Sequence, residues 1–385
     1  MTPSSQITLR GITWGHSRGL MPMVATAQRF CETNPGTEIT WVKRSLEEFG
    51  HYPLAKLAEN FDLMVIDHPF MGHAARHRLL LPLDEHLSAE FLSDQARNSV
   101  GQSHSSYAYD GHDWALAIDA AAPVSSWRPD LLARMNLGVP ESWEQLLELA
   151  RRGLVVFPAI AVDSLMHFYM FCCALEQAPF TSAETLIDPE IGARALSMLR
   201  ELVSLCSAEI LTWNPIATYE VMSSHDEFIY CPFAFGYSNY ARNGYGAQRL
   251  EFGDLSRITP GTVFRSTLGG AGLAISSSCK HRDLALEYAC FVASPRCQRT
   301  IYVQNGGQPG HRAAWTDEEA NRLTHRFFSN TLPALDRAFL RPRYDGYIGF
   351  QEAAGPVVHE FLISGGNPAD VIQKLQALYL SSRRA

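Results

Sequence analysis

The sequence has few charged residues, and its basic residues form no cluster. Only 19% of the 385 residues are charged, and 32 Lys and Arg against 40 Asp and Glu give a formal net charge of -8. Proteins that bind nucleic acid need a basic face that displaces the counterions of the phosphates. We therefore expect no nucleic-acid partner.

Long apolar runs are also lacking. The longest, residues 154–175, is interrupted by Pro158, Asp163 and His167, which predicts a strand followed by a helix and not a membrane span. Residues 1–15 have no basic start followed by an apolar core, so we expect no secretory leader within the sequence. The expected location is periplasmic if a leader has been removed, and cytoplasmic if the chain is complete as written.

The eight cysteines include no CxxC pair. Several lie inside apolar runs of helical character, such as residues 169–175 and 284–293. Cysteine in such surroundings behaves as a small buried hydrophobe. We therefore predict free, buried thiols instead of disulfides, which favours a reducing compartment.

Sequence motifs of familiar catalytic and cofactor sites are missing. The chain has no G-K-[ST] phosphate loop, no G-x-S-x-G elbow and no H-E-x-x-H pair. The run Gly269–Gly272 lacks the third glycine of a dinucleotide loop and leads into a strand, not a helix. We expect no cofactor and no metal, although a metal site built from His16, Asp67 and His68 remains an alternative.

The sequence does contain alternating strand and helix patterns. The chain is also longer than chains that usually fold around a single hydrophobic core. A chain of 385 residues with 46% hydrophobic residues is expected to form two lobes. The first predicted elements are strands over residues 6–14, 37–42 and 61–66 and helices over residues 21–33 and 53–60. The third strand is almost wholly apolar, as in buried parallel sheets, so the predicted fold class is α/β.

One segment is especially characteristic. Residues 266–298 combine a Gly-rich turn, a short strand and an amphipathic helix. Other segments carry short motifs that follow one another along the chain. These are Asp62–Asp67 followed by Leu81–Asp84, then Tyr109–Asp119, Trp127–Leu132, Gly138–Pro140 with Ser142–Leu146, and finally Asn305–Arg312. Together, across residues 7 to 315, they resemble the family 1 extracellular solute-binding proteins, the receptors of ABC importers.

The resemblance implies a two-lobed, type II periplasmic-binding-protein-like fold, with a ligand cleft between lobes that are joined by hinge crossings. The implied lobe 1 is residues 1–119 plus 266–312, and the implied lobe 2 is residues 123–262 plus 315–385 with the C-terminal helices. The glycines after residue 266 are expected to let the backbone pass close to a bound solute. The chain departs from the family pattern at Ile118-Asp119 and at residues 126–128, which argues against a simple sugar as ligand.

Solutes bind such folds at the carboxyl ends of parallel strands, so the loop after the first strand is a candidate site. Trp14 offers an aromatic face, His16 a switchable imidazole, and Arg18 a guanidinium beside a helix N-terminus, which would suit a carboxylate. The alternative is that Trp14 belongs to the core and Arg18 to a surface ion pair.

Carboxylates follow two other predicted strands. Asp67 and His68 end the buried third strand, and Asp119 follows the strand over residues 114–118 at the inferred lobe crossing. Each carboxylate is predicted either to accept hydrogen bonds from ligand hydroxyls or to cap the next turn. In the second lobe, residues 155–161 are predicted to form a buried strand, with Asp163 as N-cap of the following helix.

Aromatic residues complete the candidate site. Tyr237 lies in an aromatic loop suited to stacking on sugar rings, and Tyr344 lies in a segment expected to line the cleft from the second lobe. Tyr237 could instead pack the hinge, and the basic residues beside Tyr344 could simply be solvated. The predicted ligand-binding residues are Trp14, His16, Arg18, Asp67, His68, Asp119, Tyr237, Gly270 and Tyr344.

The sequence thus predicts a monomeric, non-enzymatic solute-binding protein of an ABC-type importer, with a membrane permease as partner. Its ligand is expected to be a small polar molecule, carbohydrate-like or carboxylated, with His16 and Arg18 favouring an organic anion or a sugar acid. The alternatives are an enzyme that uses Asp67, Asp119 and His16 in the same cleft, and an intracellular ligand sensor on the same fold.

Overall fold

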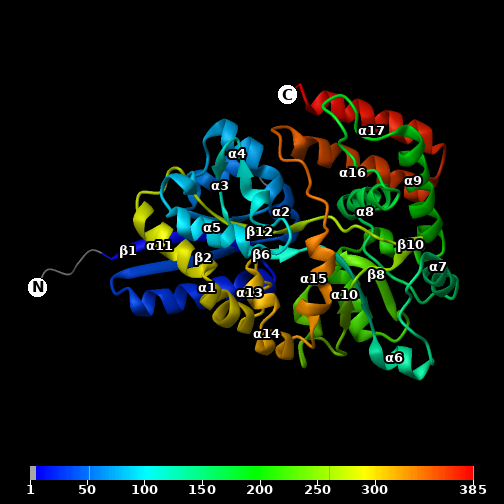
Figure 1. The fold of residues 1–385 in the computed structure, drawn as a ribbon, viewed down its shortest axis with the longest axis horizontal. Coiled ribbons are helices and arrows are strands. Elements are labelled where there is room, and N and C mark those ends of the chain that lie inside the picture. Colours follow the sequence, from blue (N-terminus) through cyan, green and yellow to red (C-terminus); the bar gives the residue numbers. More distant parts are fainter. Residues whose placement is uncertain (1–5, 52, 260, 385) are drawn as a thin grey trace, which may run out of the picture. The chain divides into compact units, whose positions relative to one another are not determined.

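The computed structural model describes residues 6–51, 53–259 and 261–384, and the chain forms two compact units (Figure 1). Unit 1 consists of Met1–Ala121, Gly269–Leu323 and Arg343–Asp345, and unit 2 of Ala122–Leu268, Thr324–Pro342 and Gly346–Ala385. The chain therefore passes repeatedly from one unit to the other, and neither unit is made from one uninterrupted segment.

The unit boundaries differ from the predicted lobe ranges in three places. Residues 266–268, predicted in lobe 1, belong to unit 2. Residues 315–323 belong to unit 1, where the indole of Trp315 donates a hydrogen bond to the carbonyl of Pro309 at 2.6 Å. Residues 343–345 also belong to unit 1, because the amide of Gly72 donates to the carbonyl of Arg343 at 2.7 Å. The expectation that Tyr344 lies in the second lobe is therefore wrong.

Unit 1 is built around a five-stranded sheet in the order β2-β1-β3-β12-β6. The strands of this sheet are β1 (Ile7–Trp14), β2 (Thr37–Arg44), β3 (Leu63–Ile66), β6 (Leu116–Ala121) and β12 (Gly269–Ile275). Two further strands, β4 (Ala108–Tyr109) and β5 (His112–Asp113), form a separate two-stranded sheet. The α-helices of unit 1 are α1 (Ser17–Thr33), α2 (Leu46–His51), α3 (Leu54–Asn60), α4 (Met71–His77), α5 (Ala89–Arg97), α11 (Arg282–Ala293), α12 (Pro295–Cys297), α13 (Arg312–Trp315) and α14 (Glu318–Leu323). Short 3-10 helices η1 (His68–Phe70), η2 (Leu83–Glu85) and η3 (Ser105–Tyr107) and the π-helix η6 (Gln298–Tyr302) complete the unit.

The sheet of unit 1 is mixed. β1 pairs in parallel with β2 and β3, whereas β12, which begins where the chain returns from unit 2, is antiparallel to β3 and β6. All four residues of β3 are buried, so both faces of the sheet are covered. The predictions of a strand ending at Trp14 and of a buried third strand are confirmed.

Helix α1 shows how the sequence pattern becomes packing. Its buried residues include Met23, Ala27 and Phe30, which recur at helical spacing and join the same hydrophobic core as Leu9 and Ile39 of the sheet. The helix begins at Ser17, four residues before the predicted start at Met21. The sequence signal was missed because histidine, which caps this helix, is not among the usual N-cap residues.

Unit 2 contains the three-stranded sheet β8-β7-β9 and the two-stranded sheet β10-β11. Its strands are β7 (Pro123–Trp127), β8 (Tyr230–Phe235), β9 (Glu251–Gly253), β10 (Arg257–Thr259) and β11 (Thr262–Val263). Its helices are α6 (Pro129–Arg134), α7 (Trp143–Arg151), α8 (Ala161–Ala174), α9 (Pro189–Ser204), η4 (Ala208–Thr212), α10 (Pro215–Ser224), η5 (Ser238–Ala241), α15 (Phe327–Asp336), α16 (Tyr347–Ser364) and α17 (Pro368–Ser382).

The predicted strand over residues 155–161 is wrong. Residues 155–159 are buried, but the segment forms only one isolated bridge, between Val155 and Tyr230. Pro158 has no amide hydrogen to donate and so cannot continue a ladder. The amide of Ala159 instead donates to the carbonyls of Ile210 and Trp213, and the chain enters α8.

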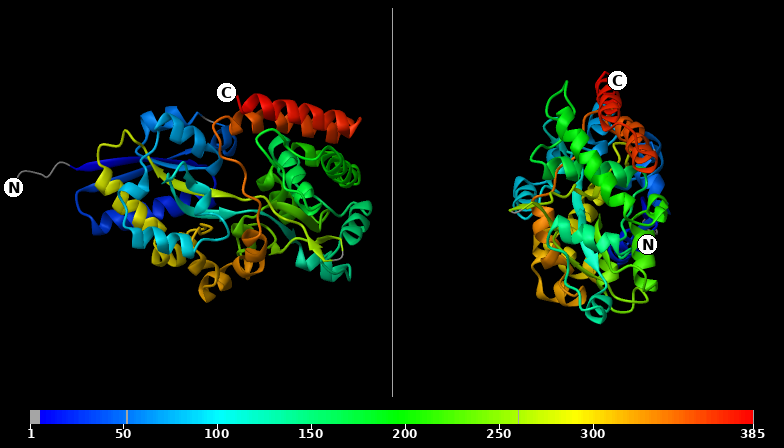
Figure 2. Two further views of the ribbon diagram at one scale, coloured as in Figure 1. Left: turned by 45° about the horizontal axis from the view of Figure 1, so that its top comes forward. Right: turned by 90° about the vertical axis from the view of Figure 1, so that its right-hand side faces the viewer.

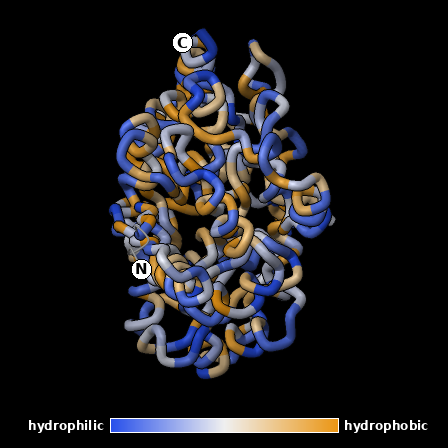
Figure 3. Tube along the Cα trace, turned by 90° about the vertical axis from the view of Figure 1, so that its left-hand side faces the viewer, coloured by the Kyte–Doolittle hydropathy of each residue, from blue (hydrophilic) through white to orange (hydrophobic). Residues whose placement is uncertain are grey.

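The C-terminal helices α16 and α17 lie side by side in unit 2 and pack with α8 and α9 (Figure 2). Helix α8 is buried around almost its whole circumference, which explains its nearly continuous apolar sequence. Hydrophilic and hydrophobic stretches alternate along the chain trace (Figure 3). None of the helices in the described ranges combines the length and apolar character needed to cross a membrane.

All eight cysteines are free thiols, and Cys172, Cys231, Cys279 and Cys297 are fully buried. The prediction of free thiols instead of disulfides is therefore confirmed. Four of the eight thiols are only partly buried.

Candidate functional site

In unit 1, the predicted site residues of four segments gather at one edge of the sheet. Trp14 is the last residue of β1 and, by the strand register, lies level with Ile66 at the end of β3. Gly272 pairs with Ile66, and Ala271 pairs with Asp119, so Gly270 and Asp119 lie just beyond the end of β3. We call this group, Trp14, His16, Arg18, Asp67, His68, Asp119 and Gly270, the strand-end site.

At the centre of the strand-end site, Arg18 and Asp119 form a buried ion pair. Nε of Arg18 donates to Oδ2 of Asp119 at 2.9 Å, and Nη2 donates to Oδ1, so the pair is bidentate. The two residues are only 4% and 1% exposed. Burial raises the pKa of Asp119, and the charge and hydrogen bonds of Arg18 oppose that rise. The structure therefore brings together the two charges that we predicted as separate ligand contacts, and solute contact by either one stays a prediction.

His16 acts as the N-cap of α1. Its Nδ1 accepts a hydrogen bond from the amide of Arg18 at 3.0 Å, which leaves the proton of the neutral ring on Nε2. Burial, together with the positive charge of Arg18, lowers the pKa of His16 to about 4. The imidazole is consequently neutral at pH 7 and does not switch near neutral pH, contrary to our expectation.

Trp14 belongs to the hydrophobic core, which was the alternative considered for it. Its ring centroid is 5.1 Å from that of Phe49, and the Arg18 guanidinium carbon lies 5.9 Å from the indole centroid. A Cβ on Gly19 would collide with the indole, so the glycine provides the space for it. The buried indole Nε1 has no hydrogen-bond partner in the part of the chain that the structure describes.

Asp67 caps the turn that follows β3, again the alternative role. Its Oδ1 accepts from the amide of His68 at 2.8 Å and lies 3.1 Å from Nδ1 of the same histidine. His68 is fully buried, and its ring stands perpendicular to that of Tyr107. Asp67, His68 and His16 do not form a metal-binding group among the described residues, so the structure does not support the alternative of a metal there.

Gly270 is required by the neighbouring strand. Its φ of +106° is unfavourable for other residues, and a Cβ would meet the backbone of Asp119 and Ala120. A β-bulge follows, between Ala271 and Gly272. The close backbone approach that we expected toward a solute is thus made to β6, and it fixes the position of Asp119.

In unit 2, Tyr237 is buried and follows β8. Its ring lies 6.3 Å from that of Tyr219, whose hydroxyl donates to the carbonyls of Ala234 and Phe235. Tyr240 adds a second ring 5.2 Å from Tyr219 and donates its hydroxyl proton to Glu220 at 2.6 Å. These tyrosines pack against one another within unit 2, and stacking of Tyr237 on a sugar stays a prediction.

Asp163 differs from its predicted role as N-cap. The N-cap of α8 is Ile160, and Asp163 lies in the first turn, buried, with no hydrogen-bond partner for Oδ2 among the described residues. Burial raises the pKa of Asp163 to about 8. One turn later, burial lowers the pKa of His167 to about 3, and the ring packs against Phe233 at 4.5 Å. Both side chains are thus neutral at pH 7.

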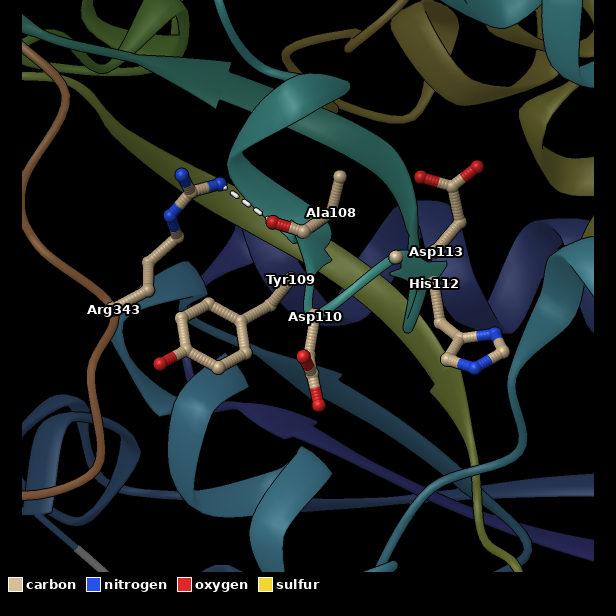
Figure 4. Close-up of a pocket in the computed structure, with 7 residues that line it drawn as sticks. Ala108, Tyr109, Asp110, His112, Asp113 and Arg343 are labelled. Atoms are coloured by element: carbon tan, nitrogen blue, oxygen red, sulfur yellow. Dashed lines mark hydrogen bonds between the residues drawn. The ribbon is translucent and has the colours of Figure 1, made fainter.

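Tyr344 lies beside a second feature of unit 1, an open pocket of about 430 Å³ formed by Ala108–Asp113 and Arg343 (Figure 4). The Asp110-Gly111 turn, with φ of 52° and 85°, joins β4 and β5 as a tight hairpin. Arg343 extends to the carbonyl of Ala108, to which it donates at 2.7 Å (Figure 4). Burial lowers the pKa of Arg343.

His112 and Asp113, which line this pocket, contact further carboxylate and histidine side chains behind it. Nδ1 of His112 lies 3.0 Å from Asp84, whose second oxygen accepts from the amide of Asp113 at 2.9 Å. Burial lowers the pKa of His104 and raises that of Asp113, while the attraction between the two, 3.9 Å apart, opposes both shifts. The volume is within the range of small-molecule sites, and the pocket is open to solvent.

Sequence reasoning did not single out Gln308, which lies beside the strand-end site, or Arg343, which lines the open pocket. The amide of Ala120 donates to the carbonyl of Gln308 at 3.0 Å, and the Gln308 side chain donates back to the Ala120 carbonyl at 2.8 Å. This pairing holds the end of β6 beside Asp119. A glutamine within the Gly-rich run 305–310 was the available signal, whereas Arg343 had none, because its partners lie more than 230 residues earlier.

Comparison with known proteins supports the fold. No protein-family model matches the chain. A solved structure of maltose-bound MalE3 of T. maritima has a TM-score of 0.81 at 17% identity, covering 97% of this chain and 99% of that one. A solute-binding protein of an ABC transporter from Agrobacterium radiobacter K84, in complex with ribitol, has a TM-score of 0.82 at 15% identity, covering 99% and 100%. Another from Thermotoga lettingae TMO, bound with alpha-D-tagatose, has a TM-score of 0.83 at 16% identity, covering 98% and 100%.

The predicted fold is therefore confirmed: the chain has the α/β fold of the ABC-transporter solute-binding proteins, along the full length of those proteins. At such low identity, the likeness speaks for the fold and not for the ligand.

Proposed function

We propose that the chain is the solute-binding component of an ABC-type importer and binds a small polyhydroxylated molecule. The observation that carries the proposal is the end-to-end structural match with proteins whose solved structures hold maltose, ribitol and tagatose. In this proposal a permease is the partner, the protein acts as a monomer, and a periplasmic location follows if a leader has been removed.

The proposed binding mode is closure of the two units on the solute by hinge motion. The chain crosses between the units after Ala121 and before Gly269, next to Asp119 and Gly270 of the strand-end site. A solute that binds the closed state better than the open state shifts the balance between them, and a transporter can sense that shift.

The charge balance of the strand-end site favours a neutral ligand over an anion. Arg18, the cation that suggested a carboxylated ligand, already binds Asp119 through two hydrogen bonds. The imidazole of His16 carries no charge at pH 7, since its pKa is about 4. We therefore favour the carbohydrate-like class over sugar acids.

The same observations favour binding over catalysis. General acid-base catalysis near pH 7 works best with a group whose pKa is close to that pH. His16 titrates well below it, and the Asp119 carboxylate is engaged by Arg18. The three residues of the enzyme alternative, Asp67, Asp119 and His16, thus serve as a turn cap, an ion-pair partner and a helix cap.

Isothermal titration calorimetry on the full chain tests the proposal. The panel contains ribitol, tagatose and maltose as neutral ligands and galacturonate as the matched acid. We expect one neutral member to bind with one molecule per chain and to raise the melting temperature; a free concentration near 100 times Kd stabilises by about 2.7 kcal/mol. Binding of galacturonate alone would reject the neutral class, and consumption of a ligand during incubation, followed by NMR, would reject the non-enzymatic function.

One observation favours a second candidate, an intracellular sensor on the same fold. All eight cysteines are free thiols, which is typical of proteins in reducing compartments. A fusion of the natural gene, with its upstream sequence, to a reporter that is active only outside the cytoplasm distinguishes the two, because only the importer component would activate it.

A further inference from the structure

Outside the strand-end site, two histidines and one carboxylate converge at the surface of unit 1. His73 and His77 lie one turn apart on the same face of α4, and Asp345 faces them from the segment 343–345. Nδ1 of His73 is 2.9 Å from Oδ1 of Asp345, and Nε2 of His77 is 3.7 Å from Oδ2. The two imidazole centroids are 4.3 Å apart.

From this geometry we infer that His73, His77 and Asp345 form a binding site for a divalent transition-metal ion such as Zn²⁺. Zinc binds imidazole nitrogen and carboxylate oxygen at about 2.0 to 2.2 Å, which in a tetrahedral site places neighbouring ligand atoms roughly 3.3 Å apart. The three potential ligand atoms all lie within 4.8 Å of one another, so only small side-chain rotations bring them onto one ion. The fourth position is left for water.

The backbone around the site is fixed, which is the feature that distinguishes it from a chance surface cluster. Gly72 precedes His73, and a Cβ on it would collide with the carbonyl of Arg343 and lie 2.6 Å from the amide of Asp345. The Gly72 amide donates to that same carbonyl at 2.7 Å. The segment carrying Asp345 therefore packs directly on the helix that carries the two histidines, and the carboxylate needs no loop movement to reach an ion.

The ligand chemistry selects the class of metal. Two neutral imidazoles with one carboxylate suit Zn²⁺, Ni²⁺ and Cu²⁺, whereas Mg²⁺ and Ca²⁺ prefer oxygen ligands. Arg76 donates to Oδ2 of Asp345 at 2.9 Å and would have to release that oxygen. Its side chain is 58% exposed, so it can turn into solvent.

A metal ion at His73, His77 and Asp345 would affect the attachment of residues 343–345 to unit 1, whether or not a solute is bound. Residues 343–345 are joined at both ends to residues of unit 2. A metal ion that bridges Asp345 to α4 would add to the hydrogen bonds that hold this crossing segment on unit 1.

Calorimetric titration of the tag-free full chain with Zn²⁺ tests the inference. We expect one Zn²⁺ per chain with micromolar affinity, at least about 10-fold weaker in His77→Ala and in Asp345→Asn, and no comparable binding of Mg²⁺. His86→Ala is the matched control, an exposed histidine of unit 1 outside the cluster, and should bind Zn²⁺ like the unchanged protein.

Hydrogen exchange provides a second readout. Zn²⁺ should slow amide exchange in residues 343–345 of the unchanged protein and of His86→Ala, but not of His77→Ala. Because His77 is exposed, its replacement should leave the metal-free melting temperature unchanged. Absence of Zn²⁺ binding at about 100 µM, or equal binding by His77→Ala, would overturn the inference.

Discussion

The guanidinium of Arg18 binds the carboxylate of Asp119 through two parallel hydrogen bonds, although the residues are 101 positions apart in the sequence. Arg18 lies in the first turn of α1, after β1, and Asp119 lies in β6, at the other side of β3 and β12 in the sheet. The pair thus links the first strand-helix unit of the fold to the strand from which the chain leaves unit 1.

Breaking this pair should destabilise the protein strongly. Asp119→Ala leaves a buried guanidinium without its counter-charge, and we expect the free energy of unfolding to fall by about 3 to 5 kcal/mol. Replacing both residues together, as Arg18→Met with Asp119→Leu, should cost less than either single change, because no lone charge remains. Urea unfolding monitored by circular dichroism measures all three.

The control for this series is an exposed ion pair in the same unit, Arg322 with Glu319. Solvent screens such a pair, so Glu319→Ala should leave the urea midpoint unchanged. The double variant could instead lose as much unfolding free energy as the two single variants added together. That result would show that the charges of Arg18 and Asp119 do not depend on each other.

The buried residues Asp163 and His167 predict an unusual dependence of stability on pH. The pKa of Asp163 rises from 3.8 to about 8, so its contribution to stability is lost as the pH increases through that range. The pKa of His167 falls from 6.5 to about 3, so its contribution is lost as the pH decreases through that range. The two slopes cancel where the ranges overlap, from about pH 4 to 6.5, and above pH 6.5 only the loss from Asp163 remains.

Asp163→Asn tests this account, because it removes one titration and keeps the shape of the side chain. The variant should be more stable than the unchanged protein above pH 6.5, and its stability should no longer fall there, where the expected slope is about 1.4 kcal/mol per pH unit. Unfolding free energies at a series of pH values from 4 to 8 provide the measurement. An unaltered slope above pH 6.5 in Asp163→Asn would contradict the assignment of Asp163 as a buried, protonated acid.

Local patterns were sufficient to predict the first strands of unit 1. The strand ending at Trp14 and the apolar strand Leu63–Ile66 follow from residue type and period alone. The prediction of a strand over 155–161 was wrong because it followed burial and β-propensity and gave too little weight to Pro158, which has no amide hydrogen to donate. The partners that the next amides find could not be read from the sequence. The start of α1 was placed too late because its cap is a histidine.

The site was harder to predict than the fold. The sequence correctly indicated that Asp67 follows a strand, but the prediction that Asp119 follows one is wrong, because β6 continues from Leu116 to Ala121 and includes it. The sequence also could not show that Arg18 and Asp119 form an ion pair, since that depends on side-chain direction across two intervening strands. Tyr344 was assigned to the wrong unit for a similar reason: its neighbours Arg343 and Asp345 bind β4 and α4, which lie far away in the sequence.

Four of the free thiols, Cys172, Cys173, Cys206 and Cys231, should be unreactive while the protein is folded. Burial raises the pKa of Cys206 and of Cys173 to about 12, and it raises those of Cys172 and Cys231 as well. Because the thiolate is the reactive form, iodoacetamide at pH 7.5 should leave these four unmodified in the native protein and label them after unfolding in urea. Peptide mass spectrometry identifies the labelled sites. Rapid native labelling of Cys172 or Cys231 would show that α8 or β8 opens frequently.

Gly270 should tolerate no side chain, because two separate costs coincide there. Its φ of +106° is strained for alanine, and the new Cβ would meet the backbone of Asp119 and Ala120 on β6. We expect Gly270→Ala to lower the free energy of unfolding by at least about 1 to 3 kcal/mol. Gly138→Ala is the control, since a Cβ there meets nothing within 4 Å, and its effect should stay within about 0.5 kcal/mol. Both are measured by urea unfolding. If the two variants are equally stable, the contact of β12 with Asp119 cannot be what holds the strand-end site in place.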